Sequence, residues 1–400
     1  MNAKRVASWI ARSVVVLVSA AMLAVSAYAY VTYRNVTTNL ATDDVIVSDT
    51  PSSSSSSAQA PVRKPAQDVN ILLVGIDSRT DNQGHPLPRQ VLDALQAGNS
   101  DGEQNTDTMM VVHVPADSTK KAFAVSLPRD SYVSIAGGFG MHKLNSAYAR
   151  GKIAAANTLR NQGKDADTVT RESTTAGRKN LIATVTALTG LHIDHYAEIN
   201  LFGFSEITNA VGGVPVCLNN PVHDSYSGAN FPAGPQTLQG IDALKFVRQR
   251  HGLAGGDLDR VRRQQAFLAG LANRMFSAGT LADPGKVSSL VDALTKAVVL
   301  DKGWDLLGFA QQLRDLTGDH IEFTTIPTIR PNLPTPSDGV AVEVSPAAVK
   351  AFVQNLLDPA PPTPPGEGTP DARKIVVQQE KVQKIANVQP IDAGGIPCVD

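Results

Sequence analysis

The sequence predicts an α/β domain around a largely buried central sheet of mixed strand direction, preceded by one transmembrane helix. Three short runs of apolar residues indicate strands buried on both faces, at residues 69–76, 109–114 and 122–127. Amphipathic stretches alternate with such runs, as they do in α/β proteins. The expected helices are a stretch through Leu181, Val185 and Leu188 and then residues 202–211, 261–275 and 287–300, before a late strand at residues 321–326.

The N-terminal segment indicates in which cellular compartment the folded domain lies. Residues 13–33 carry no charge, and an apolar helix of about 20 residues is enough to span a bilayer. Three basic residues precede this run, so the positive-inside rule keeps residues 1–12 in the cytoplasm and exports the rest. A cleaved signal peptide is the alternative, because Ala27 and Ala29 resemble a processing site. Both interpretations export the folded domain, and the first makes the chain a single-pass protein of the cell membrane.

Composition divides the exported part into a linker, a domain and a tail. Residues 34–68 include six consecutive serines and few apolar residues, so we expect a disordered linker. Residues 69–357 have the composition of a folded domain. Residues 358–400 begin with a cluster of prolines, which predicts a stiff connector and a short tail. In an oxidising compartment, Cys217 and Cys398 predict a disulfide from tail to domain, with two free thiols as the alternative.

The composition and the motifs also exclude some classes of function. A net charge of -1 gives no overall positive field, which together with export disfavours a nucleic-acid partner. The histidines lack metal-ligand spacing. No nucleophile elbow, Walker loop, zinc-protease motif or dinucleotide fingerprint is present.

Arginines are concentrated in residues 246–265, FVRQRHGLAGGDLDRVRRQQ. If residues 246–250 are extended, Arg248 and Arg250 point to the same face, because side chains alternate along a strand. Two adjacent guanidinium groups repel each other unless an anion lies between them. Arginine binds phosphate with two parallel hydrogen bonds and keeps its charge. The segment therefore predicts a phosphate site, and an ordinary helix start with internal ion pairs is the alternative.

The helix after these arginines adds further polar residues. Asp257 is a suitable N-cap, and the stripe that starts there passes through Gln264 into apolar positions, so Gln264 is expected to face inward. Arg260 flanks this stripe. Arg262 points to the opposite side and is expected to be solvated.

Acidic residues stand where expected strands meet loops. Asp77 follows the first strand and Asp107 precedes the second, positions where carboxylates commonly hold Mg²⁺. Alone, each is better explained as a turn or capping residue, and the arginine cluster is what favours the metal role. Arg129 and Asp130 end the third strand and bring another cation to the same edge. Lys143 is expected to join them at this edge, and the alternative is that Lys143 lies in a solvated loop.

Eight segments of the chain, in this order, resemble the LytR-CpsA-Psr family of bacterial cell-envelope proteins. They are NILLVGIDSR, TDTMMVVHV, SLPRDSYV, HKLNSAYARG, HYAEINLFGF, AVGGVPV, LQGIDALKFVRQR and GDLDRVRRQQ. The long insert between Asp77 and Asp107, the region of Cys217 and the closing GIPCVD look most like actinobacterial members. One departure is Asn105, where many relatives carry an arginine, so one phosphate contact is in question.

The resemblance implies a membrane-anchored α-β-α sandwich that binds a polyprenyl-pyrophosphate lipid in an apolar groove, with Mg²⁺ or Mn²⁺ at the head group. It implies metal roles for Asp77 and Asp107. The catalytic residues it implies are Arg129, Arg248, Arg250, Arg260 and Asp257. The substrate-binding residues that we expect are Arg79, Asp130, Lys143, Arg263 and Gln264.

The expected activity is transfer of a glycopolymer from its lipid carrier to a muramic acid hydroxyl of peptidoglycan, with arabinogalactan and teichoic acid among the polymers considered. Such phosphotransfer depends on positioning and charge stabilisation, which is consistent with a site that lacks a covalent nucleophile. Two alternatives stay open. One is a polyprenyl-pyrophosphate hydrolase, and the other is a non-catalytic module that binds lipid-linked precursors and regulates the envelope.

Overall fold

The structure of the chain is a computed structural model. It describes residues 40–46, 67–78, 87–94, 105–117, 119–249, 251–253, 256–276, 283–306, 308–309, 312, 321–359, 391–392 and 395–400. The expected cytoplasmic segment and transmembrane helix, residues 1–12 and 13–33, lie outside these ranges, as do Arg79 and Arg250. Within the ranges, no helix has the length and apolar character needed to cross a membrane.

A mixed central sheet organises the domain, and eight of its strands lie in the described part of the chain. In spatial order they are β1 (Ala41–Asp43), β12 (Val298–Asp301), β7 (His195–Asn200), β2 (Val69–Ile76), β3 (Thr106–Val114), β4 (Ala122–Ser126), β13 (Ile321–Thr325) and β16 (Ile391–Asp392). β2 is parallel to β7 and antiparallel to β3. β4 is antiparallel to β3 and parallel to β13. The expected mixed, largely buried sheet is confirmed.

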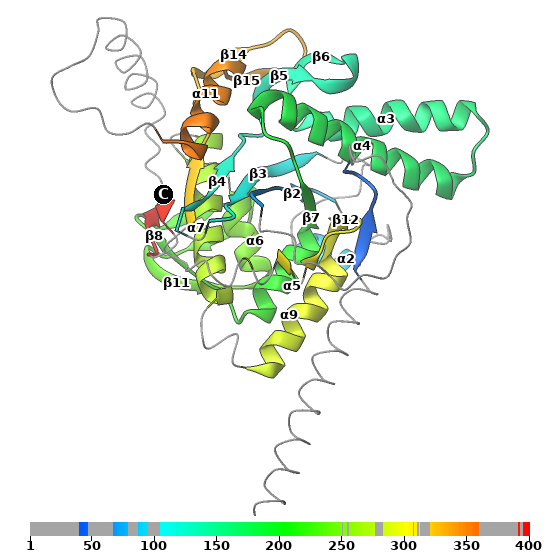
Figure 1. Ribbon diagram of the computed structural model, residues 1–400. Coiled ribbons are helices and arrows are strands. Elements are labelled where there is room, and N and C mark those ends of the chain that lie inside the picture. The colour runs from blue at the N-terminus through cyan, green and yellow to red at the C-terminus, as the bar shows by residue number, and fades with distance from the viewer. Residues whose placement is uncertain are drawn as a thin grey trace, which may run out of the picture.

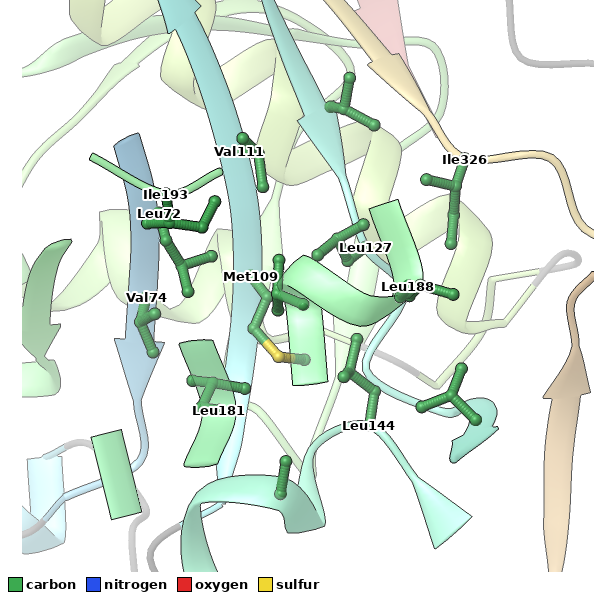
Figure 2. Packing of buried hydrophobic residues seen from close by; sticks show 14 of the residues in the cluster. Leu72, Val74, Met109, Val111, Leu127, Leu144, Leu181, Leu188, Ile193 and Ile326 are labelled. Carbon is green, nitrogen blue, oxygen red and sulfur yellow. The ribbon is translucent and has the colours of Figure 1, made fainter. Parts of the chain in front are cut away.

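Helices cover both faces of this sheet (Figure 1). One face carries α3 (Ser146–Asn161), α4 (Ala166–Thr189) and α11 (Pro346–Leu357), and the other carries α5 (Leu201–Ala210), α6 (Gly240–Arg248), α7 (Asp257–Phe276) and α9 (Pro284–Ala297). Alternation along β2 explains the two layers, because Leu72 and Val74 pack with α4, whereas Leu73 packs with the cluster of α6 and α7. Figure 2 shows Leu72, Val74, Met109 and Val111 beside Leu181 and Leu188 of α4. The fold is the expected α-β-α sandwich.

Smaller elements complete the margins of the domain. They are α2 (Arg89–Ala94), the 3-10 helix η1 (Ala136–Gly138), the sheet of β14 (Arg330–Pro334), β15 (Val340–Glu343), β5 (Ser131–Ile135) and β6 (Gly140–Lys143), the sheet of β11 (Gly234–Leu238), β8 (Val214–Leu218) and β17 (Cys398–Val399), and the pair β10 (Ala229–Phe231) and β9 (Val222–Asp224).

Two local expectations are wrong. Residues 246–248 are not extended but close helix α6, and only Gln249 beyond them has extended backbone, with φ -56° and ψ 134°. The helix expected at residues 287–300 ends at Ala297, and β12 follows it. Its β-branched Val298 and Val299 pair with β7, where branched side chains pack well against a neighbouring strand.

The expected disordered linker is wrong for residues 40–46. Ala41–Asp43 forms β1, which pairs in parallel with β12, and Val45 is buried. The Asp43 carboxylate accepts hydrogen bonds from Arg178 at 2.6 Å and from the Thr175 hydroxyl at 2.7 Å. A short polar segment is therefore held by strand pairing and charge rather than by its own apolar content.

A buried ion network fastens this edge strand to the sheet. Arg178 donates to both carboxylate oxygens of Glu198, from Nε at 2.9 Å and from Nη2 at 2.7 Å, and Tyr196 donates to Glu198 at 2.6 Å. Burial acts to lower the pKa of Arg178, but the attraction of Glu198 outweighs it and the pKa lies well above its usual value. Arg178 is thus a charged link between α4, β7 and β1.

Replacing Arg178 with alanine is expected to lower the free energy of unfolding by about 3–5 kcal/mol, because Glu198 stays buried without its cation. Urea denaturation monitored by circular dichroism measures the loss. Arg330 is the matched control, since its side chain is 52% exposed beside Glu343 and its removal should cost less than about 1 kcal/mol. Equal effects of the two substitutions would contradict the stabilising role of the network.

The end of the chain belongs to the domain. Cys217 and Cys398, the expected pair, form a disulfide with a Cα–Cα distance of 4.3 Å. Around it, β17 pairs in parallel with β8, and β16 pairs with β13. The tail is held to the domain by the expected disulfide and also by strand pairing at residues 391–392 and 398–399, which the sequence did not predict.

Loss of this disulfide is expected to lower the free energy of unfolding by about 2–5 kcal/mol, because the cross-link restricts an unfolded chain over a sequence separation of 181 residues. Thermal unfolding of the chain with both cysteines replaced by serine should match that of the reduced wild type. If oxidised and reduced wild type unfold at the same temperature, the disulfide makes no contribution.

Candidate functional site

The site lies at one edge of the central sheet, where several strand ends meet. Ile76, the last residue of β2, pairs with Thr106 of β3 and with Asn200, the last residue of β7. Ser126 ends β4 opposite Met110 of β3. The side chains that directly follow or begin these strands therefore share one edge, as the acids and Arg129 were expected to do.

A β-bulge presents Asp107 at this edge. Gly75 of β2 pairs with Thr108, but the next residue, Ile76, pairs with Thr106, so Asp107 is an extra residue in β3. A bulged residue leaves the regular alternation of the strand, and bulges are frequent beside active sites. Asp107 consequently lies within β3 rather than before it, and its carboxylate faces the loop after β4.

Arg129 and three neighbours form a chain of ion pairs. Arg129 Nη1 donates to Asp107 Oδ1, and Arg129 Nε lies 3.6 Å from Asp130 Oδ1. The same Asp130 oxygen is 3.4 Å from Lys143 Nζ. Lys143 thus lies in strand β6 beside Asp130, and not in the solvated loop that was the alternative. A backbone hydrogen bond brings the segment after β6 close to the Arg129 loop, since Asn145 N donates to the Arg129 carbonyl at 3.0 Å.

Electrostatics link this chain of ion pairs to the start of α7. Burial acts to lower the pKa of Arg129, but the carboxylates of Asp107, Asp130 and Asp257 together raise it above its usual value. Asp257 in turn pairs with Arg260, which is only 2% exposed. Asp257 is the first residue of α7 rather than its N-cap, because helical hydrogen bonding already begins at Gly256.

Gln265 anchors α7 to the strand ends and is a residue that sequence reasoning missed. It is 0% exposed, and its Nε2 lies 2.7 Å from the Thr324 carbonyl and 2.9 Å from the hydroxyls of Ser126 and Thr325. The carbonyl is a strict acceptor, so it fixes the orientation of the amide. The only sequence signal for Gln265 was its place as the second glutamine of the RRQQ segment.

Three other residues of α7 were singled out from the sequence, and Gln264 faces inward as expected. Arg263 is buried behind the site, where it donates to Gln249 and to the Asp400 carbonyl and stacks over Phe246. Burial lowers the pKa of Arg263 to about 10, so it stays charged at neutral pH. Gln264 donates to the Val247 carbonyl at 3.3 Å. Arg262, expected to be solvated, is half-buried.

Arg248 closes α6 and is half-buried, while Arg250 lies outside the described residues, so the expected pair of arginines is described at one position only. The Asn105 carbonyl accepts a hydrogen bond from Asp77 N at 3.1 Å. The position that carries arginine in many relatives therefore borders the expected metal ligand.

The donor set fits a magnesium ion whose coordination is completed by substrate. Asp77 directly follows β2 and Asp107 is the bulged residue of the neighbouring β3, at the same edge. No group of three or more His, Cys, Asp or Glu side chains able to hold a metal occurs among the described residues. Mg²⁺ commonly binds one or two carboxylates together with water and phosphate oxygens, so two aspartates are enough for such a site.

The arrangement is suited to a negatively charged ligand that arrives with a cation. Three described cations of the site are paired with carboxylates: Arg129 with Asp107, Lys143 with Asp130, and Arg260 with Asp257. A pyrophosphate group is also negatively charged and has more oxygen acceptors than a carboxylate. It can take the place of these carboxylates beside the cations when a metal ion neutralises the carboxylates.

Comparison with known proteins gives consistent results. The model of the LytR_cpsA_psr family matches residues 28–351. Over 304 residues the chain is 47% identical to cell wall biosynthesis protein LcpA of Corynebacterium glutamicum, covering 74% of this chain and 57% of that protein. It is 32% identical over 239 residues to polyisoprenyl-teichoic acid–peptidoglycan teichoic acid transferase TagU of Oceanobacillus iheyensis, covering 60% of each.

The chain thus spans between half and two thirds of the length of these relatives. Among solved structures, the LytR-Csp2A-Psr enzyme from Actinomyces oris superposes with a TM-score of 0.52 at 17% identity, covering 79% of this chain and 95% of that one. This likeness shows that the fold is shared.

Proposed function

Because the chain belongs to the LytR-CpsA-Psr family, we propose that it transfers a glycopolymer from a polyprenyl-pyrophosphate carrier to peptidoglycan. The family assignment from the eight sequence segments is correct, and relatives in the family are named for cell wall biosynthesis and for transfer of teichoic acid to peptidoglycan. The transfer reaction of this chain, its lipid carrier and its polymer are our proposal.

The observation that carries the proposal is Arg129 among three carboxylates at the sheet edge, with Arg260 in the first turn of α7. Both guanidinium groups are largely shielded from water, where their attraction for phosphate is stronger than in bulk solvent. The start of a 20-residue helix adds a partial positive charge. This combination favours two adjacent phosphates over a neutral ligand.

The rest of α7 supports a lipid carrier. Beyond its charged first turns, Leu268, Leu271 and Met275 are half-buried rather than fully enclosed in the core. A helix of this length runs about 30 Å, so one element offers charge at its start and apolar contacts further along. A pyrophosphate with a polyprenyl chain has the same division of charge and apolar surface.

In the proposed reaction, a muramic acid hydroxyl attacks the phosphorus nearer the sugar. A new P–O bond forms, the P–O–P bond breaks, and polyprenyl phosphate leaves with the electron pair. The hydroxyl proton passes to a carboxylate of the site, for which Asp130 and Asp257 are the two choices. Arg129 and Arg260 hold the phosphates and stabilise the charge of the transition state. Mg²⁺ or Mn²⁺ on Asp77 and Asp107 would neutralise phosphate charge when bound.

We further propose that residues 13–33 anchor the chain in the cell membrane with the domain outside the cytoplasm, since the carrier lipid stays in the bilayer. Arabinogalactan is the polymer that we would test first, because the motifs resemble actinobacterial members and the identity to the Corynebacterium protein exceeds that to the teichoic acid transferase.

Reconstitution tests the proposal. The full chain in detergent is incubated with labelled lipid-linked polymer, peptidoglycan and Mg²⁺, and wall-bound label is counted after washing. We expect label to enter peptidoglycan only when all components are present. Cleavage of the lipid pyrophosphate at the same rate without peptidoglycan would identify a hydrolase. Binding of the lipid without any turnover would identify a regulatory module.

A further inference from the structure

Tyr226 and His251 form an exposed aromatic stack. Their ring centroids are 4.0 Å apart and the ring planes differ by 27°. Tyr226 is 73% exposed, and the His251 side chain is 61% exposed. Because one face of the tyrosine ring rests on the imidazole, its exposure comes largely from the opposite face, which is flat, apolar and open to solvent.

The stack is held from the tyrosine side by a buried carboxylate. Tyr226 lies in the turn between β9 and β10, where the Asp224 carboxylate accepts from Tyr226 N at 2.9 Å and from the Ser227 hydroxyl at 2.7 Å. Phe231 of β10 then meets Phe246 of α6 edge-on, at 6.2 Å. The hairpin is thus fixed to the helix that Arg248 closes.

The histidine side is held as well. Gln249 Nε2 donates to the His251 carbonyl at 3.1 Å, and the other end of that amide accepts from the buried Arg263. His251 Nδ1 is 3.9 Å from Asp224 Oδ1, the same carboxylate that fixes the tyrosine turn. Single exposed apolar residues need no explanation. A stacked pair with buried supports on both sides is a pre-organised surface.

We propose that this Tyr226–His251 stack is a binding platform for a sugar ring, and that the ring it holds is the one next to the pyrophosphate of the lipid-linked donor. The inference rests on the proposed function. The C–H face of a sugar ring is apolar and its rim is hydroxylated, which matches an aromatic face bordered by a phenol, an imidazole and water. Gln249 holds the His251 carbonyl and accepts from Arg263, which follows Arg260 by about one turn of α7, so a sugar bonded to a phosphate at Arg260 is the carbohydrate that we assign to the platform.

A binding experiment on the full chain tests the platform without requiring turnover. Two soluble probes are compared, geranyl pyrophosphate and the same lipid pyrophosphate carrying one hexose. Tyr226→Ala is expected to weaken binding of the hexose probe by about 5- to 30-fold and to leave binding of the sugar-free probe unchanged. Tyr226→Phe keeps the ring face and should bind both probes like the wild type.

Ile153→Ala is the matched control, since Ile153 is another exposed apolar residue, at 60%, and it lies on α3. Equal binding of the hexose probe to wild type and Tyr226→Ala would overturn the inference. A loss of binding by Tyr226→Ala that is confined to soluble peptidoglycan fragments would also overturn the inference, because it would assign the platform to the acceptor. If neither probe binds the wild type at all, the proposed function fails rather than the platform.

Discussion

Replacing Arg129 with alanine is expected to slow polymer transfer by about 100- to 1,000-fold, the usual effect of removing one charge-stabilising donor from a phosphoryl or acyl transfer site. Arg129 sits among Asp107, Asp130 and Asp257, whose carboxylates raise its pKa above the usual value. Without it, three carboxylates would face the incoming pyrophosphate. The initial rate of label transfer to peptidoglycan measures the loss.

Two further variants separate chemistry from folding. Arg129→Lys keeps the charge but loses the planar fork that binds phosphate with two hydrogen bonds, so it should retain an intermediate rate. Arg89→Ala is the control, because Arg89 is an exposed arginine that pairs with Asp93 four residues on. An alanine variant at position 129 that folds and transfers at the wild-type rate would remove Arg129 from the mechanism.

Replacing Asp77 or Asp107 with asparagine is expected to raise the Mg²⁺ concentration for half-maximal transfer by at least about 10-fold, since one of the two carboxylate ligands that we propose becomes neutral. The effect of Asp107→Asn should be larger, because that carboxylate also holds Arg129 in place. Titrating Mg²⁺ in the transfer assay after removal of metal with a chelator gives the value for each variant.

Asp242→Asn serves as the control for these substitutions. Asp242 is exposed on α6 and pairs with Lys245, so the metal requirement of the variant should equal that of the wild type. If the chelated wild type transfers polymer without any added divalent ion, the proposed metal site is wrong whatever the variants do.

The main layers of the fold could be predicted because buried strands need uninterrupted apolar runs and amphipathic helices need a regular stripe. Residues 69–76 became β2 with the same bounds. Strand β1 could not be foreseen, because Ala41–Asp43 has no apolar pattern of its own. Its partners are β12 and Arg178, which lie more than a hundred residues further along the chain.

The site was predictable where a residue's role follows from its place at a strand end. Asp77, Asp107 and Arg129 are of this kind, since neighbouring strands bring such residues to one edge. On α7 the inward stripe was predicted correctly for Gln264, which is buried and donates to the Val247 carbonyl of α6. The next residue, Gln265, is also buried and bonds the strand ends, because the buried side of α7 is wider than that single stripe.

Contacts between residues far apart in the sequence could not be predicted from local sequence patterns. Lys143 meets Asp130 because β6 and the Arg129 loop run side by side, which no spacing in the sequence indicates. Tyr226 and His251 are brought together by a buried aspartate and by the packing of a hairpin on α6.

Mass spectrometry of the reaction product tests the central claim most directly. After reconstitution, the wall is digested with a muramidase and the polymer-bearing fragments are weighed. The account predicts one phosphorus atom between the polymer and a muramic acid residue, with polyprenyl monophosphate released in equal amount. Free polymer ending in phosphate, with unmodified muramic acid, would contradict transfer and identify hydrolysis instead.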